Sequence, residues 1–312
     1  MRSDEIILNK YDIIIVGAGP AGIAASIYAS RKHLKTLTLT KNIGGQAAIS
    51  INVKDYSGYQ LISADELINK FKENQEDFNL EVKYGFEVDF IEKTPTGFKV
   101  GLNDDFYFAK AVIIATGREP KKLGVSGEYK FLGKGVSYCS TCDAPFFKDK
   151  VVSVIGSSSA AIYAIIQLLP IAKKIFLINN LNEFNVDPIL FKKVKSSKKV
   201  KILNNYYLQE ISGDKVLKNI KIKNKNGKVE VLTIDGLFIE IGSKPVIPNV
   251  ISNGKKLKTN LKHEIVIDKS CQTNISGLFA AGDVTNVPEK QVIIAAGQGC
   301  IASLSAFRFI NR

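Results

Sequence analysis

Two segments of the sequence, 11–30 and 150–169, predict an α/β protein with two dinucleotide-binding domains. Each begins with a short apolar run, continues into a turn of glycine or serine, and ends in small residues with helical spacing. A strand, a tight turn and a helix in this order open a Rossmann-like βαβ unit, which binds a dinucleotide at the helix N-terminus. The chain has 312 residues, which is enough for two such domains.

The first segment, YDIIIVGAGPAGIAASIYAS, carries a complete glycine motif. Gly17, Gly19 and Gly22 fit G-x-G-x-x-G between the predicted strand and helix. The first glycine permits the turn, the second lets the backbone approach a pyrophosphate, and the third permits close packing of the helix. About 20 residues further on, where an acid would hold the ribose of NAD, the stretch TLTLTK contains none. The motif therefore favours a dinucleotide other than NAD.

The second segment, KVVSVIGSSSAAIYAIIQLL, has a degraded motif. It keeps Gly156 but has Ser158 and Ala161 at the second and third positions. A serine at the second position places a side chain where the pyrophosphate would approach. No arginine occurs from 119 to 307 to bind the 2′-phosphate of NADP. We expect the fold of a nucleotide domain here, with neither NADPH nor NADH bound well.

Two further segments place small or acidic residues at the ends of strands. AKAVIIATG ends at Thr116 and Gly117, and GLFAAGDVTN places Gly282 and Asp283 in a turn before an amphipathic helix. Asp283 can accept a hydrogen bond from a ribityl or ribose hydroxyl, and the helix N-terminus can face a ring carbonyl or phosphate. Alternatively, Asp283 only caps that helix.

The stretch SYCSTCDAPFF contains the pair Cys139 and Cys142, with Asp143 directly behind. Such a pair is a metal clamp, a structural staple or a redox centre. The other cysteine and histidine residues are isolated in sequence: Cys271, Cys300, His33 and His263. A zinc site needs two more ligands at suitable spacing, so we expect no metal. We expect the two isolated cysteines to be buried, inert thiols and the two histidines to lie on the surface.

The net charge, the cysteine count and the lengths of the apolar runs indicate which partners and which cellular compartment to expect. The net charge is +13, which suits either a solvated lysine-rich surface or an acidic partner. No nucleic-acid motif is present. Few cysteines, an N-terminus without a signal-peptide core, and no apolar run near the roughly 20 residues that span a bilayer favour a cytoplasmic protein. We expect no nucleic-acid or membrane partner.

In combination, these motifs resemble those of the low-molecular-weight thioredoxin reductases, class II pyridine nucleotide-disulfide oxidoreductases. The resemblance covers nearly the full length and rests on the order of GAGPAG, GGQ, ATG, CSTCD, the second dinucleotide-like segment, AAGD and QVIIAAGQG. It implies an FAD domain at 1–117 and 247–312, interrupted at 118–246 by a domain that carries the cysteine pair and normally binds NADPH. It also implies a homodimer that passes electrons from NADPH through FAD and the disulfide to thioredoxin.

The resemblance implies a role for each motif residue. Cys142 would be the cysteine nearest the flavin, Cys139 would exchange with the thioredoxin disulfide, and Asp143 would move protons during exchange. The residues that would contact FAD are Gly17, Gly19, Pro20, Ala21, Gly22, Gly45, Gln46, Thr116, Gly117, Gly282, Asp283, Gln291 and Val292.

The NADPH half departs from the family pattern. The family has HRRxxxR after the second domain's second strand, whereas this sequence has NNLNEFN, so Asn180, Leu181 and Asn185 replace three arginines. Charge-assisted contacts of this kind are worth about 1.5 to 3 kcal/mol each. Some members of the family are reduced by ferredoxin or a deazaflavin instead. We therefore expect an FAD-dependent thioredoxin-disulfide reductase that does not use NADPH efficiently, with an acidic donor such as ferredoxin.

Two other interpretations remain open. One is an ordinary NADPH-dependent thioredoxin reductase with unusual contacts to its donor. The other is a redox-sensing flavoprotein without catalytic turnover, although a purely structural role does not need paired thiols followed by an acid. A relative of the ferredoxin–NADP reductases would share the fold, but those proteins lack the C-x-x-C pair that Cys139 and Cys142 form.

Overall fold

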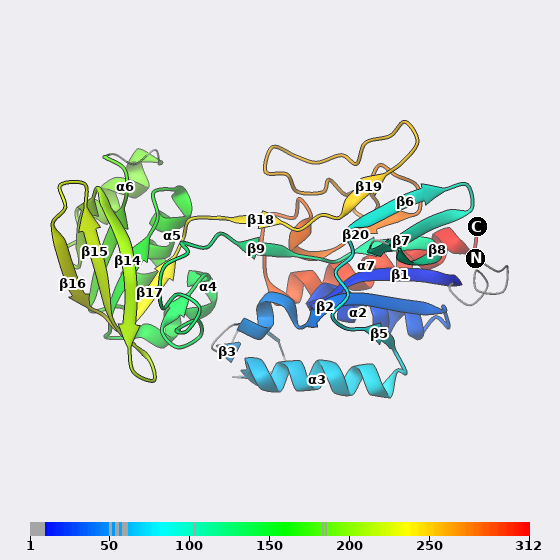
Figure 1. Ribbon diagram of the computed structural model, residues 1–312, viewed down its shortest axis with the longest axis horizontal. Coiled ribbons are helices and arrows are strands. Elements are labelled where there is room, and N and C mark those ends of the chain that lie inside the picture. The colour runs from blue at the N-terminus through cyan, green and yellow to red at the C-terminus, as the bar shows by residue number, and fades with distance from the viewer. Residues whose placement is uncertain are drawn as a thin grey trace. The chain divides into compact units, whose positions relative to one another are not determined.

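The computed structural model describes residues 10–49, 52–53, 56–57, 62–102, 104–182, 184 and 186–312. The chain forms two compact units. Unit 1 comprises Met1–Ala48, Asp55–Glu119 and Lys244–Arg312, and unit 2 comprises Ile49–Lys54 and Pro120–Ser243. Each contains a parallel α/β arrangement (Figure 1), so the predicted fold class of two Rossmann-like domains, the second inserted into the first, is confirmed.

Unit 1 is built on an eight-stranded sheet with the order β19-β6-β7-β8-β1-β2-β5, and β20 also pairs with β8. The strands β1, β2 and β8 run parallel, whereas β6, β7 and β8 form an antiparallel meander. Its elements are β1 (Lys10–Ala18), α2 (Pro20–Ser30), β2 (Thr36–Ile43), η1 (Gly45–Ile49), β4 (Ile62–Ser63), α3 (Ala64–Asp77), β5 (Glu81–Lys83), β6 (Phe90–Thr94), β7 (Gly97–Leu102), β8 (Asp105–Ile114), β19 (Asn249–Ile251), β20 (Leu278–Ala280), η3 (Gly282–Val284) and α7 (Val292–Ile310).

The apolar run of β1 forms a strand that is buried on both faces, as expected for a parallel strand in a sheet that is covered on both sides. Ile13 and Ile15 belong to a core formed with the small residues of α2 and α7. Ile14 and Val16 belong to the core on the opposite face. The end of β1 is thereby fixed, and the glycine turn that follows is presented at the carboxyl edge of the sheet.

Helix α7 is long and apolar enough, by length and composition alone, to cross a membrane. The expectation that no apolar run approaches that length was therefore wrong for this segment. In unit 1, however, α7 packs closely on α2, since a Cβ added at Gly299 would lie 2.0 Å from the carbonyl oxygen of Ala21. Ala302 and Ala306 on the same helix are fully buried. These contacts are those of a core helix.

The larger segment of unit 2, Pro120–Ser243, is green to yellow in Figure 1 and contains a five-stranded parallel sheet with the order β10-β17-β11-β12-β13 and a separate antiparallel sheet, β14-β15-β16. One core lies between the two sheets, and the other lies between the parallel sheet and α5 with α6. The elements of unit 2 are β3 (Asn52–Val53), β10 (Val136–Ser137), α4 (Ser140–Asp143), η2 (Ala144–Phe147), β11 (Val151–Ile155), α5 (Ser159–Leu168), β12 (Lys174–Asn179), α6 (Pro188–Lys195), β13 (Val200–Asn204), β14 (Tyr206–Gly213), β15 (Leu217–Asn224), β16 (Val229–Thr233) and β17 (Gly236–Ile239).

Two short strands, β9 (Arg118–Pro120) and β18 (Ser243–Pro245), carry the chain between the units and pair with each other. Each ends in a proline, Pro120 and Pro245. Proline fixes its own φ and removes a backbone donor, so a pair of this kind ends after a few residues.

Candidate active site

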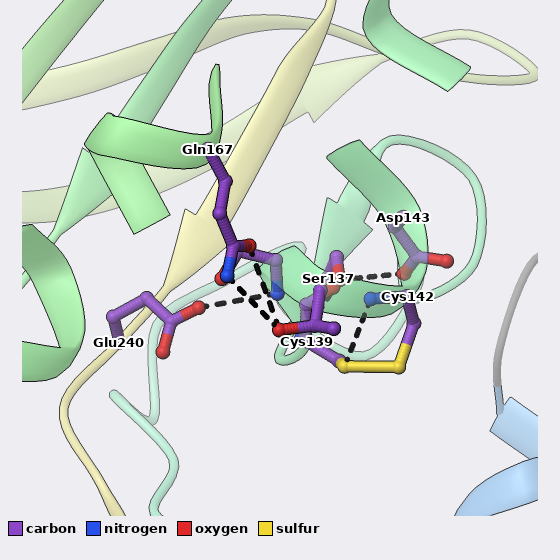
Figure 2. Close-up of a disulfide and its surroundings, with 8 residues drawn as sticks. Ser137, Cys139, Cys142, Asp143, Gln167 and Glu240 are labelled. Atoms are coloured by element: carbon purple, nitrogen blue, oxygen red, sulfur yellow. Dashed lines mark hydrogen bonds between the residues drawn. A yellow bond between two sulfur atoms is a disulfide. The ribbon is translucent and has the colours of Figure 1, made fainter. Parts of the chain in front are cut away.

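Cys139 and Cys142 form a disulfide in unit 2, directly after β10 (Figure 2). Cys139 is the N-cap residue of the four-residue helix α4, and its Sγ accepts a hydrogen bond from the backbone N–H of Cys142 at 3.2 Å. The pair thus lies at the start of a helix. Within the described residues, no group of three or more histidine, cysteine or acidic side chains is placed to hold a metal ion.

The hydroxyl of Ser137 connects the acid of the motif to the backbone of the first cysteine. It donates to Asp143 Oδ2 at 2.6 Å and accepts from the backbone N–H of Cys139 at 3.0 Å (Figure 2). Ser137 and Asp143 are both buried. Sequence reasoning selected Asp143 but missed Ser137, although a hydroxyl at a strand end two residues before the motif was a usable signal.

A second acid, Glu240, reaches the same turn from the end of β17. Its Oε1 accepts a hydrogen bond from the backbone N–H of Ser140 at 3.2 Å (Figure 2). Burial raises the pKa of Glu240 to about 7, while the hydrogen bonds of Ser140 act in the opposite direction. Sequence reasoning missed this residue. The available signal was an acid that follows directly on the apolar strand GLFI.

Glu240→Gln should stabilise the protein in a pH-dependent way. The folded-state pKa of about 7 lies above the ordinary glutamate value of 4.5, so the folded protein binds this proton more tightly than the unfolded chain. The wild type therefore loses stability as the pH rises from about 4.5 to about 7, and not below that window. We expect the advantage of Glu240→Gln to grow across the window and level off above it, with an upper limit on the order of 3 kcal/mol at about 1.4 kcal/mol per pKa unit.

Denaturant unfolding of both proteins at several pH values measures this difference. A constant advantage at all pH values would contradict the assignment, since it would show that the carboxyl does not change its protonation on unfolding.

The first glycine turn of unit 1 has the geometry that its motif predicts. Gly17 has a φ of +106°, and a Cβ there would lie 2.4 Å from the carbonyl oxygen of Ala115. A Cβ at Gly22 would lie only 1.8 Å from the carbonyl oxygen of Gly17. Gly22 is therefore required by the packing of the turn itself, and Gly17 by the packing of the turn against the residues that follow β8.

Gly19 differs from its two neighbours because it borders open space. The nearest atoms to a Cβ there, the carbonyl oxygen of Gly44 and the Cα of Gly45, are both 4.0 Å away. Gly45 has a φ of +54°, and its own Cβ would lie 3.4 Å from the Cα of Gly19. Two turns without side chains thus face each other at the start of α2, where Pro20 is the first residue. A cradle of this kind fits the pyrophosphate of a dinucleotide such as FAD.

The other predicted FAD residues lie in unit 1 as well. The Thr116 hydroxyl donates to the carbonyl of Val246, and Gly117 follows with a φ of +67°. Gly282 packs on α2, since a Cβ there would lie 2.9 Å from the Cβ of Ala21. Gln46 lies in η1, and Gln291 and Val292 begin α7 as its N-cap and first residue, all three half-buried.

Asp283 lies within η3, and the N-cap of α7 is Gln291. The alternative that Asp283 only caps that helix is therefore wrong. Burial raises the pKa of Asp283, and the positive charges of Lys290 and Arg118 oppose this rise. A carboxyl in such surroundings can accept hydrogen bonds from sugar hydroxyls. Its role toward FAD stays a prediction.

The isolated cysteines and histidines lie mostly where the sequence places them. Cys271 is 2% exposed, and burial raises the pKa of its thiol to about 12. Cys300 is only half-buried, so the expectation of a buried thiol was wrong there. His33 and His263 are exposed.

The turn that begins at Gly156 in unit 2 is packed like the first glycine turn, but its second glycine position is occupied by Ser158. A Cβ at Gly156 would lie 2.4 Å from the carbonyl oxygen of Glu240 and 3.0 Å from the Cβ of Ala161. Ser158 is the exposed N-cap of α5, and its hydroxyl makes no capping hydrogen bond with the helix. The side chain therefore stands at the position where a dinucleotide backbone contact would be made.

The side chain of an asparagine at the end of β12 forms two hydrogen bonds with the backbone of the loop that follows. Buried Asn179 accepts from the backbone N–H of Leu181 at 2.9 Å and donates to the carbonyl of the same residue at 3.1 Å. Asn180 and Leu181 are exposed. Asn185, the third arginine replacement, lies outside the described residues. At the two described positions where the family has arginines, 180 and 181, the loop therefore has no cationic side chain.

A family model for pyridine nucleotide-disulphide oxidoreductases matches residues 11–299. The chain belongs to this family. Its fold is similar to that of thioredoxin reductases, and the family implies FAD as the cofactor.

Relatives of known sequence and structure agree with this assignment. The chain is 34% identical over 306 residues to a component of the alkyl hydroperoxide reductase of Staphylococcus epidermidis, an alignment that covers 97% of the chain and 60% of that protein. It therefore spans less than two thirds of the length of the curated relatives it matches.

Among solved structures, the chain is similar to a thioredoxin reductase from Streptococcus pyogenes MGAS5005, with a TM-score of 0.90 and 34% identity over 97% of this chain and 99% of that one. It is also similar to a ferredoxin-flavin thioredoxin reductase from Clostridium acetobutylicum, with a TM-score of 0.51 and 29% identity over 97% and 99% of the two chains.

Proposed function

We propose that this protein is an FAD-dependent reductase of a thioredoxin-like protein, and that its electron donor is an acidic protein of the ferredoxin class in place of NADPH. The observation that carries the proposal is the Cys139–Cys142 disulfide at the start of α4, with Asp143 held beside it by Ser137. When bound, FAD would supply the two-electron chemistry, and the turn that begins at Gly17 would hold its pyrophosphate.

Disulfide exchange needs an attacking thiolate and a proton for the sulfur that leaves. The backbone N–H of Cys142 already donates to the Sγ of Cys139, and the same contact would stabilise a thiolate on that sulfur after reduction. Asp143 is buried beside the pair and is suited to take and return a proton. We therefore assign Cys139 to exchange with the protein substrate and Cys142 to exchange with the flavin.

The choice of donor rests on the second nucleotide site. Asn179 uses its side chain to close the loop after β12, and Asn180 and Leu181 expose no positive charge there. The sequence from 180 to 187 contains no lysine or arginine. The net charge of +13 suits an acidic donor, and a ferredoxin-flavin thioredoxin reductase is among the relatives.

Restoring the family residues should increase the use of NADPH. The triple variant Ser158→Gly, Asn180→Arg, Leu181→Arg opens the turn and adds two phosphate ligands. Each charge-assisted contact is worth about 1.5 to 3 kcal/mol, so we expect kcat/KM for NADPH to rise by at least about tenfold. The matched control is Ser158→Gly, Asn180→Gln, Leu181→Gln, which adds length without charge and should gain little. Equal gains in both triple variants, or none in either, would contradict the argument about the lost arginines.

A second candidate substrate follows from the 34% identity to the alkyl hydroperoxide reductase component. In that case the same disulfide would pass its electrons to the partner protein of a hydroperoxide-reducing system. The chemistry of Cys139 and Cys142 would be unchanged, and only the protein that docks on the pair would differ.

Turnover with a disulfide substrate tests the proposed reaction. The purified flavoprotein is reduced continuously by light and a sacrificial donor under anaerobic conditions, with a large excess of oxidised thioredoxin, and the thiols that appear on thioredoxin are counted. We expect many thioredoxin molecules to be reduced per enzyme. A single equivalent per enzyme would contradict the proposal and favour a redox-sensing flavoprotein. Turnover only with a peroxide-reducing partner would favour the second candidate.

A further inference from the structure

Two hydrogen-bond acceptors of unit 2 lie on one short turn. The Sγ of Cys139 accepts from the backbone N–H of Cys142, and the carboxyl of Glu240 accepts from the backbone N–H of Ser140, the residue directly after that cysteine (Figure 2). The carboxyl arrives from β17, next in the sheet to the strand that carries Ser137. The two acceptors are therefore held by backbone N–H groups two residues apart, at Ser140 and Cys142, in the same chain segment.

We propose that Glu240 and the Cys139 thiol of the reduced protein share one proton, so that Cys139 becomes a thiolate as the carboxyl of Glu240 becomes protonated. The exchange is balanced: a carboxylate and a thiol become a carboxylic acid and a thiolate, and no net charge moves into or out of the turn. This inference rests on the proposed function, because it requires that the Cys139–Cys142 disulfide be reduced during the reaction.

The physical reason is repulsion between two negative charges in a poorly solvated place. Glu240 has lost most of its contact with water, which disfavours its charged form and leaves the pKa near 7. A thiolate on Cys139 would add a second negative charge one residue from the donor that the carboxylate uses. Two such groups titrate as a coupled pair, and the ionisation of one raises the pKa of the other.

The other ionisable groups around Glu240 are few. Asp143 comes from α4, and its carboxylate is hydrogen-bonded to Ser137 instead of Ser140. Tyr163 on α5 is more than half exposed, and Tyr138 donates its hydroxyl to Glu128. The strands β10 and β11 and the helix η2 carry no ionisable side chain. Glu240 is thus the acid in direct contact with the segment between the two cysteines.

The test measures the reactivity of Cys139 as a function of pH. The intact flavoprotein is reduced with a phosphine under anaerobic conditions and treated with iodoacetamide between about pH 5 and about pH 9. Alkylation of the two cysteines is followed separately by peptide mass spectrometry. The proteins compared are the wild type, Glu240→Gln and Gln167→Ala, the last of which removes an uncharged contact to Thr141 in the same turn.

We expect the ionised carboxyl of Glu240 to raise the pKa of the Cys139 thiol by about one unit, so Glu240→Gln should be alkylated up to about tenfold faster at about pH 8. At about pH 5, where Glu240 is protonated, the two proteins should react at the same rate. Gln167→Ala should follow the wild-type profile. Superimposable profiles for Glu240→Gln and the wild type would overturn the proposal.

A second measurement needs no variant to fold. The reduced-minus-oxidised infrared spectrum of the wild type near neutral pH should gain the C=O stretch of a newly protonated carboxylic acid. Absence of the band in the wild type would overturn the proposal. If the phosphine-reduced protein behaves as expected here but never reduces thioredoxin, the proposed function fails and this inference stands. A disulfide that no phosphine reduces would overturn both.

Discussion

Replacing Cys142 by serine is expected to abolish the reduction of thioredoxin and to trap the enzyme on its substrate. With Cys139 alone, the thiolate can attack the substrate disulfide, but no second thiol is present to resolve the mixed disulfide. Turnover should fall by on the order of a thousandfold or more, because the covalent route is removed. Non-reducing mass spectrometry should show a covalent complex with thioredoxin for Cys142→Ser and none for Cys139→Ser.

The same experiment decides between the two assignments of the sulfurs. A trapped complex with Cys139→Ser, and none with Cys142→Ser, would contradict the assignment of Cys139 as the exchanging cysteine. Cys300→Ser is the matched control, since this thiol is half-buried and belongs to unit 1. It should keep full turnover and form no complex.

Substitutions in the glycine turn of unit 1 should affect folding and cofactor binding separately. Gly19 has a φ of −77° and no atom within 4 Å except two at 4.0 Å, so its backbone and surroundings accept a side chain. Gly19→Asp should therefore fold but lose FAD, because a carboxylate would face the pyrophosphate. Gly22→Ala meets a carbonyl oxygen at 1.8 Å and should lose about 4 kcal/mol of stability or more.

Flavin content and circular dichroism after purification measure the two effects separately. We expect Gly19→Asp to be colourless and folded, Gly19→Ala to be folded with reduced flavin content, and Gly22→Ala to be insoluble or unfolded. A yellow Gly19→Asp protein with normal flavin content would contradict the placement of the pyrophosphate at this turn.

The fold could be predicted from the sequence because its strongest signals are local. An apolar run, a glycine turn and a helix are consecutive in the chain, and each of the two copies carries all three. The steric reason for Gly22 is also local, since the carbonyl oxygen of Gly17 in the same turn excludes a side chain there, whereas the atoms that exclude one at Gly17 belong to the distant Ala115 and Thr116. The cysteine pair at a helix start is a local pattern as well.

The missed parts of the candidate site depend on contacts between distant segments. Glu240 lies 100 residues after Ser140 in the sequence, and only the pairing of β17 beside β10 brings them together. Nothing in the strand GLFI indicates which neighbour its end will meet. The half-exposed position of Cys300 and the separation of Asp283 from the start of α7 likewise depend on packing that the sequence does not specify.

An anaerobic titration of the flavin tests the central claim most directly. The absorbance of the purified yellow protein is followed while NADPH, then NADH, then chemically reduced ferredoxin is added, with oxidised thioredoxin present as the electron acceptor. We expect ferredoxin to bleach the flavin rapidly and NADPH to do so only slowly at high concentration, because Ser158, Asn180 and Leu181 do not provide a phosphate site. Rapid bleaching by micromolar NADPH would contradict this account and would assign the protein to the ordinary NADPH-dependent reductases.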